Sequence, residues 1–103
     1  MAPMIQPTSD EACELEVTIA NREGLHARPA AQFVRVAAKY PKVELTVCKD
    51  AMSVNGKSII GIMMLAAGPG SRLQIKAQGE GAKSLLTDLE TLVASRFGEE
   101  GIS

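Results

Sequence analysis

Residues 14–39 read ELEVTIANREGLHARPAAQFVRVAAK, and this stretch contains two different hydrophobic periods in succession. Over 14–19, apolar side chains alternate with polar ones, which is the pattern of a strand with one buried face. Over 27–39, the apolar residues recur at helical spacing instead, and Pro41 follows just after the expected end. The stretch therefore predicts a half-buried strand, ending at 24–25, that leads directly into an amphipathic helix.

The rest of the chain repeats these two patterns. Short alternating runs predict three more strands, at 43–47, 52–54 and 72–77. Ser58 is a suitable N-cap for a short helix that continues to Leu65. The clearest helical pattern covers 82–97, where Gly98 ends it.

These elements follow the order βαββαβα. Because strands with one polar face favour antiparallel pairing, the chain predicts an α+β fold in which three helices cover one face of an antiparallel sheet. Residues 1–12 carry two prolines and show no hydrophobic period, so we expect a flexible N-terminal tail. Residues 13–103 are expected to form a single domain.

Composition excludes several classes of function. Eleven basic and twelve acidic residues give a net charge of −1, and two Phe with one Tyr provide few stacking surfaces, so a nucleic-acid binder is not expected. No apolar run approaches the ~20 residues that span a bilayer, and no secretory signal is visible, so we expect a cytoplasmic protein with no membrane insertion. A single histidine without a Cys/His cluster predicts no metal site.

That histidine, His26, lies where the first helix begins. Backbone N–H groups at a helix N-terminus lack intrahelical partners and favour anions, which makes the terminus a potential phosphate site. The N–H groups of Ala27 and Arg28 are the expected donors, and the planar guanidinium of Arg28 suits phosphate oxygens. Pro29 falls in the first turn, where a missing N–H is tolerated.

A lone histidine is more often a surface or half-buried residue without a chemical role. A chemical role for His26 is favoured here because His26, Arg28 and Pro29 all fit the predicted start of a helix. Together they suggest a histidine that carries a phosphoryl group on a ring nitrogen.

Two motifs in this chain resemble those of the HPr phosphocarrier family of the bacterial phosphoenolpyruvate:sugar phosphotransferase system. The first, GLHARPA at 24–30, looks like that family's active-site signature. The second, NGKSIIGIMML at 55–65, looks like its regulatory-serine segment. The resemblance covers roughly 14–97 and implies an open-faced β-sandwich with a four-stranded sheet in the order 1-4-2-3.

The resemblance also implies a mechanism and partners. His26 would accept a phosphoryl group at Nδ1 from Enzyme I and donate it to enzyme IIA components in sugar uptake. The chain would thus be a phosphocarrier with a transient phosphohistidine rather than a free-standing catalyst, with no cofactor and as a monomer. Ser58 would be the site of an HPr kinase/phosphorylase, and a transcriptional regulator would be a further partner.

Ile59, Ile60 and Met63 belong to an apolar set on the short helix that cannot easily all point inward. We therefore predict an exposed docking patch there, with methionine suited to several partners because its side chain adapts.

Two other functions stay open at this point. One is phosphotransfer for regulation, as in the nitrogen-related branch of the same system, without sugar transport. The other is a binding module that uses the fold without phosphotransfer, and the presence of His26 with Arg28 argues strongly against it.

Overall fold

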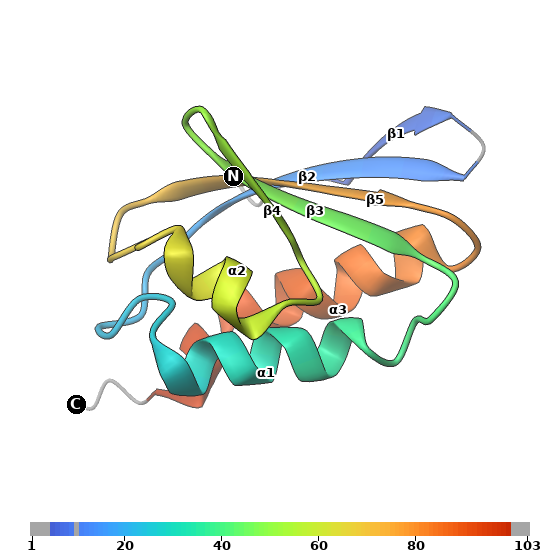
Figure 1. Cartoon of the computed structure of the whole chain (residues 1–103). Helices are drawn as coiled ribbons and strands as arrows, with labels where there is room; N and C mark the ends of the chain where they lie inside the picture. The colour runs from blue at the N-terminus through green and yellow to red at the C-terminus, as the bar shows by residue number, and fades with distance from the viewer. Residues whose placement is uncertain (1–4, 10, 100–103) are drawn as a thin grey trace.

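A five-stranded antiparallel sheet forms one layer of the molecule, and three helices of the described residues cover one of its faces (Figure 1). The computed structural model describes residues 5–9 and 11–99. Its elements are β1 (Gln6–Ser9), β2 (Ala12–Thr18), α1 (Ala27–Ala37), β3 (Glu44–Lys49), β4 (Met52–Asn55), α2 (Ile59–Met64), β5 (Arg72–Gln78), α3 (Ala82–Ala94) and a terminal 3-10 turn (Arg96–Gly98).

The strands lie in the order β1-β2-β5-β3-β4. Without β1, this order is the predicted 1-4-2-3, so the α+β open-faced sandwich is confirmed. The short β1 is an additional edge strand that the sequence did not predict. It pairs with the start of β2, and its Pro7 is tolerated because an edge strand has one side free of ladder bonds. Residues 1–4 and 10 of the predicted tail lie outside the described residues.

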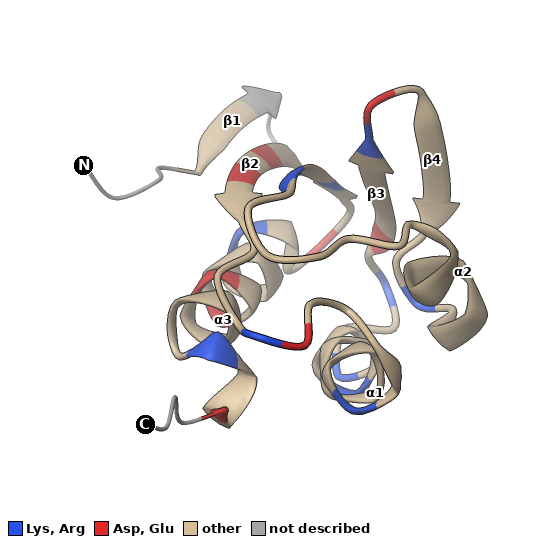
Figure 2. Ribbon diagram, turned by 90° about the vertical axis from the view of Figure 1, so that its left-hand side faces the viewer, with Lys and Arg blue, Asp and Glu red and all other residues tan. Residues whose placement is uncertain are grey.

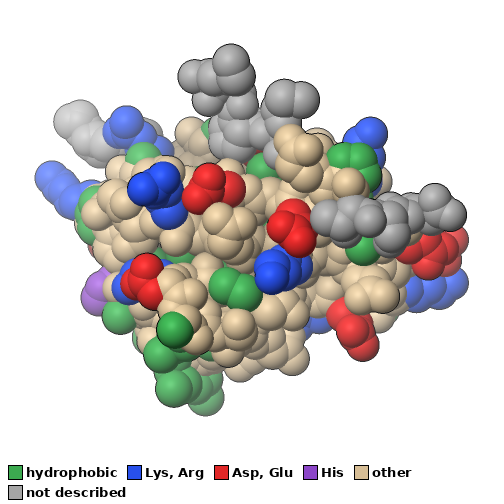
Figure 3. All heavy atoms as spheres, turned by 90° about the horizontal axis from the view of Figure 1, so that it is seen from above, with side chains coloured by type: hydrophobic (Ala, Val, Ile, Leu, Met, Phe, Trp, Pro, Cys, Tyr) green, Lys and Arg blue, Asp and Glu red, His purple; other side chains and the backbone are tan. Residues whose placement is uncertain are grey.

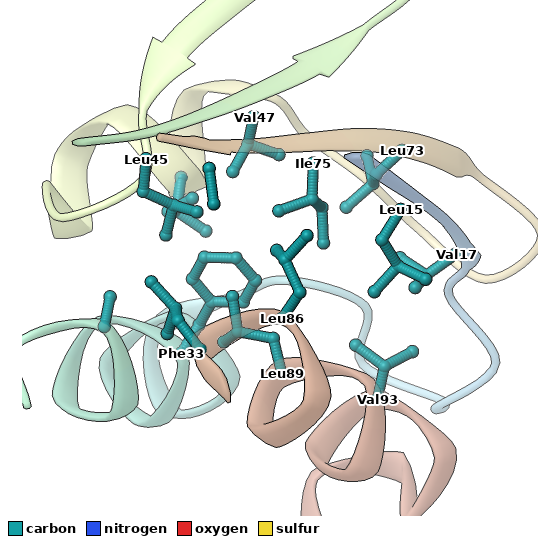
Figure 4. Close-up of a cluster of buried hydrophobic side chains, with 14 of the residues drawn as sticks. Leu15, Val17, Phe33, Leu45, Val47, Leu73, Ile75, Leu86, Leu89 and Val93 are labelled. Carbon is teal, nitrogen blue, oxygen red and sulfur yellow. The ribbon is translucent and has the colours of Figure 1, made fainter. Parts of the chain in front are cut away.

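The core lies between the sheet and the helices (Figure 4). Alternate residues of the three central strands point inward, and the register places Ile75 of β5 between Leu15 of β2 and Val47 of β3. Side chains of α1 and α3 meet them from below, and the most deeply buried of these include Phe33, Leu85, Leu86 and Leu89. The period-two and helical patterns of the sequence thus correspond to the two sides of one core.

The last helix is shorter than its hydrophobic period suggests. The sequence predicted a helix to residue 97, but α3 ends at Ala94. Arg96 and Phe97 both have positive φ, 57° and 55°, so the chain leaves the helical path there. Phe97 is still buried, at 3 % exposure, because this tight turn brings the ring back onto the core. The hydrophobic period therefore predicted the burial of Phe97 correctly, but its prediction of a helical backbone at this residue was wrong.

Candidate active site

His26 is the N-cap residue of α1, as the sequence predicted for the helix start. Its backbone is extended, with φ −80° and ψ −163°, and its carbonyl accepts the first helical hydrogen bond from the Ala30 N–H at 2.8 Å. The imidazole makes no capping bond within the described residues, and His26 is exposed. Its ring is therefore open to a partner protein.

The first turn of α1 presents two backbone donors next to this imidazole. Pro29, at the third helical position, has no N–H and packs into the core, where it is almost fully buried. The N–H groups of Ala27 and Arg28 have no partner among the described residues. These are the donors that the sequence predicted for an anion, because helix-start N–H groups carry the positive end of the helix dipole.

Arg28 adds a full positive charge to the same turn. The residue is exposed, and the first turn of α1 contains no acidic side chain that would repel an anion. A guanidinium and two free N–H groups beside a ring nitrogen can bind the oxygens of a phosphoryl group during its transfer.

The chain reaches this helix through a loop, not through the strand itself. β2 ends at Thr18, so the prediction of a strand ending at 24–25 was wrong. Gly24 has φ +64°, and a Cβ at this position would lie 2.3 Å from the carbonyl oxygen of Ala67. Only glycine allows so close an approach in this conformation. The Leu25 N–H then donates to the same Ala67 carbonyl at 2.9 Å, which ties the loop to the segment after α2.

Ser58 caps α2, as predicted. Its Oγ accepts a hydrogen bond from the Gly61 N–H at 3.0 Å. The turn before it is built by Asn55, whose Oδ1 accepts from the Lys57 N–H at 2.8 Å. The serine side chain therefore has a structural role whether or not it is modified.

The apolar residues of α2 divide between core and surface. Ile62 is fully buried and Leu65, just after the helix, is nearly so. The other four large side chains are exposed to solvent: Ile59 (42 %), Ile60 (72 %), Met63 (41 %) and Met64 (62 %). We call these four the α2 patch. It includes the three predicted docking residues and extends to Met64.

The α2 patch and the histidine lie at the same end of the molecule. Figure 1 shows α2 crossing beside the start of α1, and these two helices contact each other directly. Seen from above the sheet, a group of hydrophobic side chains protrudes near the purple histidine (Figure 3). A partner that covered the patch would therefore lie beside the His26 ring.

Hydrogen bonds of Tyr40 keep α2 in place relative to the other two helices. Its carbonyl accepts from Lys57 Nζ at 2.6 Å, just before α2, and its hydroxyl donates to the Asp88 carboxylate on α3. The bond to Asp88 raises the pKa of Tyr40 above its ordinary value. The three helices are linked in this way beyond their apolar contacts.

A wide hollow of the described surface lies elsewhere. It runs along β2 and the end of α3, where Glu16, Thr91 and Arg96 are among its lining residues, and His26 is not.

Sequence reasoning missed two residues that hold the loop before His26. Asn21 is the buried polar residue of the described chain, at 1 % exposure, and it donates a hydrogen bond to Glu99 near the other end of the chain. This bond lowers the pKa of Glu99 below its ordinary value, with further help from backbone N–H groups of the loop. The ordinary pKa of a glutamate is 4.5, and the pKa of Glu99 in the folded protein lies below it. Any stability that the ionised Glu99 contributes is therefore fully present above pH 4.5, and it is lost as the pH falls through the lowered pKa.

Comparison with known proteins identifies the family. Residues 13–95 match the family model described as the PTS HPr component phosphorylation site. The chain belongs to the HPr family. The phosphocarrier protein HPr of Pseudomonas aeruginosa is 48 % identical over 86 residues, which cover 82 % of this chain and 94 % of that one. That of Treponema pallidum is 39 % identical over 84 residues, with the same coverage of both chains.

Solved structures agree with this assignment. HPr from Thermoanaerobacter tengcongensis superimposes with a TM-score of 0.81 at 42 % identity, over 84 % of this chain and 97 % of that one. HPr from Bacillus anthracis does so with a TM-score of 0.75 at 39 % identity, over 80 % and 96 %. The family, the fold and the role of an HPr phosphocarrier in the phosphotransferase system, all expected from the two motifs, are therefore confirmed. Membership implies Enzyme I and enzyme IIA components as partners.

The described residues form no helix long and apolar enough to cross a membrane.

Proposed function

We propose that His26 accepts the phosphoryl group from Enzyme I and passes it to enzyme IIA components in cytoplasmic sugar uptake. The observation that supports this most directly is the position of the chain's sole histidine. It caps α1 with an exposed ring beside two free N–H groups and a guanidinium.

The chemistry is an exchange of one phosphorus–nitrogen bond for another. The unprotonated ring nitrogen of His26 attacks the phosphorus of the Enzyme I phosphohistidine in line, and the bond to the Enzyme I nitrogen breaks. The Ala27 and Arg28 N–H groups and the Arg28 guanidinium bind the phosphoryl oxygens as their charge moves. The same steps in reverse order deliver the group to an enzyme IIA histidine or other acceptor nucleophile. This chemistry asks for no metal on this chain.

The α2 patch is the proposed docking surface for both partners. Burying exposed isoleucine and methionine side chains is favourable by about 25 cal/mol per Å² of apolar surface. Docking there brings the partner's reacting group to the adjacent start of α1. Ile59, Ile60 and Met63 are the residues that we assign to this contact.

The sugar-uptake role predicts which acceptors the phosphorylated chain will use. With phosphoenolpyruvate and Enzyme I, it should transfer its phosphate to a sugar-specific IIA protein within seconds, measured by loss of label from this chain and gain by the acceptor. A nitrogen-type IIA protein is the matched comparison. Transfer only to the nitrogen-type acceptor would contradict the sugar-uptake role and favour the regulatory branch.

Ser58 is proposed as a regulatory site for an HPr kinase/phosphorylase, with a transcriptional regulator as reader of the phosphorylated form. A phosphate adds about −1.5 to −2 charges near pH 7, and the start of a helix tolerates negative charge. The folded state should therefore survive modification. The effect should fall on docking, because Ile59 next to the serine belongs to the α2 patch and must lose water when a partner binds.

Two substitutions separate the cap from the regulatory role. Ser58→Asp should raise KM for Enzyme I about tenfold, equal to ~1.4 kcal/mol of weakened docking, with little change in melting temperature. Ser58→Ala should lose about 1 kcal/mol of unfolding free energy, because the Gly61 N–H loses its acceptor, while transfer stays near normal. Steady-state kinetics and thermal melts measure both. An unchanged KM for Ser58→Asp would contradict the regulatory role.

A further inference from the structure

The loop that carries the chain from β2 to His26 lies against the C-terminal end of the described residues. Figure 2 shows this loop passing the end of α3 on its way to the start of α1. Asn21 and Glu99 make the contact, although 78 positions separate them in the sequence. Neither residue belongs to the phosphate-binding turn itself, and neither was predicted from the sequence.

Asn21 uses both hydrogens of its side-chain amide. Nδ2 donates to the carbonyl oxygen of Gly24 at 2.9 Å and to Oε2 of Glu99 at 2.9 Å. The Gly24 N–H donates back to the Asn21 carbonyl at 3.2 Å, which closes the turn. The other oxygen of the Glu99 carboxylate accepts from the Glu23 N–H at 3.2 Å. One carboxylate therefore holds the loop at two points.

The orientation of the Asn21 amide follows from these partners. A flipped amide would place its oxygen against the Gly24 carbonyl and the Glu99 carboxylate, both of which are acceptors. In the observed orientation Oδ1 is buried, and it has no hydrogen-bond partner within residues 5–9 and 11–99. Leaving a buried acceptor unpaired is unfavourable. The Asn21 side chain thus donates two hydrogen bonds to the loop and to Glu99, while its own oxygen loses its contact with water.

The position of His26 depends on this loop. The His26 imidazole forms no capping bond within the described residues, so the backbone of His26 determines where the ring is placed. That backbone is held from one side by the bond of Leu25 to Ala67. On the other side it is held by the bonds of Asn21 and Glu99, which we call the Asn21–Glu99 clamp.

We propose that Asn21 and Glu99 are positioning residues for phosphotransfer, which hold the Gly24–Leu25 turn so that the His26 ring meets the phosphoryl group in line. The proposal rests on the proposed role of His26 as phosphate acceptor. Phosphoryl transfer depends mainly on positioning and charge stabilisation, and a displacement of about 1 Å can slow such a step about 10²-fold. The lowered pKa of Glu99 agrees with a carboxylate that is ionised while it accepts these bonds.

Three variants test the clamp through its hydrogen bonds. Glu99→Ala removes both acceptors from the loop, and Asn21→Asp keeps the shape of the side chain but turns its donors into acceptors. The double variant Asn21→Asp/Glu99→Gln reverses the direction of the bond, because the glutamine amide can donate to the new carboxylate. Glu44→Ala is the matched control, since Glu44 is exposed on β3, opposite Gln78 and so at the far end of the sheet from Thr18.

Enzyme I kinetics with the full chain give the readout, below the melting temperature of every variant. We expect Glu99→Ala to lower kcat about tenfold while KM for Enzyme I stays within about twofold, because the α2 patch is untouched. Asn21→Asp should lower kcat at least as much, and the double variant should recover part of this loss. Glu44→Ala should match the parent.

If the two residues had a purely structural role, their substitution would lower the melting temperature and leave kcat at the parent value. This result for Glu99→Ala would overturn the proposal, even if Asn21→Asp failed to fold. An effect on KM alone would also overturn it, because it would assign the clamp to docking. If the parent chain itself takes no phosphate from Enzyme I, the proposed function fails first. A parent that is phosphorylated normally beside an equally active Glu99→Ala variant contradicts the clamp alone.

Discussion

Replacing His26 with alanine is expected to abolish phosphotransfer from Enzyme I. The chain has no second histidine, so no other imidazole can form the phosphorus–nitrogen bond. The fold should survive, because the ring is exposed and makes no capping bond within the described residues. Surface changes of this kind usually alter unfolding free energy by less than about 0.5 kcal/mol. Label incorporation from phosphoenolpyruvate and a thermal melt measure the two effects.

The parent chain and Ser58→Ala are the controls for this experiment. Both should incorporate one phosphate per molecule, which shows that Enzyme I is active and that the hydroxyl at 58 is not the acceptor. Continued labelling of the His26→Ala protein at the parental rate would contradict the assignment.

Replacing Arg28 with alanine is expected to slow transfer about 10²-fold, which is the typical effect of removing one charged donor from a transition state. Melting temperature should change little, because an exposed guanidinium contributes little to stability. Arg28→Lys should recover only part of the rate, since an ammonium group keeps the charge but lacks the planar fork. Rapid-quench measurement of the phosphorylation rate distinguishes the three proteins.

Arg72→Ala is a matched control for Arg28, because it removes the same exposed group from the outer face of β5. It should transfer at the parental rate. If Arg28→Ala also transfers at that rate, the arginine is incidental and the N–H groups of the first turn suffice.

Much of this architecture was readable from local patterns. The alternation at Leu15 and Val17 reflects a strand with one face on the core, and the same holds for Leu73 and Ile75. The N-cap role of Ser58 follows from its place before an apolar run. Such features depend on a few neighbouring residues, which is why the sequence alone predicts them.

Features that depend on distant parts of the chain were not predictable in this way. The bond between Asn21 and Glu99 exists only because the fold brings these two segments, 78 positions apart, side by side. At Phe97 the backbone leaves the helical path, but the ring stays in the core. The hydrophobic period reports only the burial, so it could not reveal this change of backbone direction. Strand β1 is short, lies at an edge and contains a proline, and has no alternation to detect.

The candidate site was predicted more completely than the loop that supports it. His26, Ala27 and Arg28 are consecutive, so one helix start places all three. Their surroundings come from elsewhere: Ala67 follows α2 and meets Gly24 at a distance that permits no side chain. The residues that perform the proposed chemistry are thus local in sequence, whereas those that orient them are not.

The most direct test of the proposed mechanism is to locate the phosphate after the full chain has reacted with phosphoenolpyruvate and Enzyme I. Phosphorus-31 NMR with proton correlation to the imidazole, supported by mass spectrometry at alkaline pH, identifies the modified atom. We predict a single acid-labile, alkali-stable phosphate on a ring nitrogen of His26. A phosphate on any other residue, or a chain that stays unmodified while another HPr is phosphorylated in the same mixture, would contradict it.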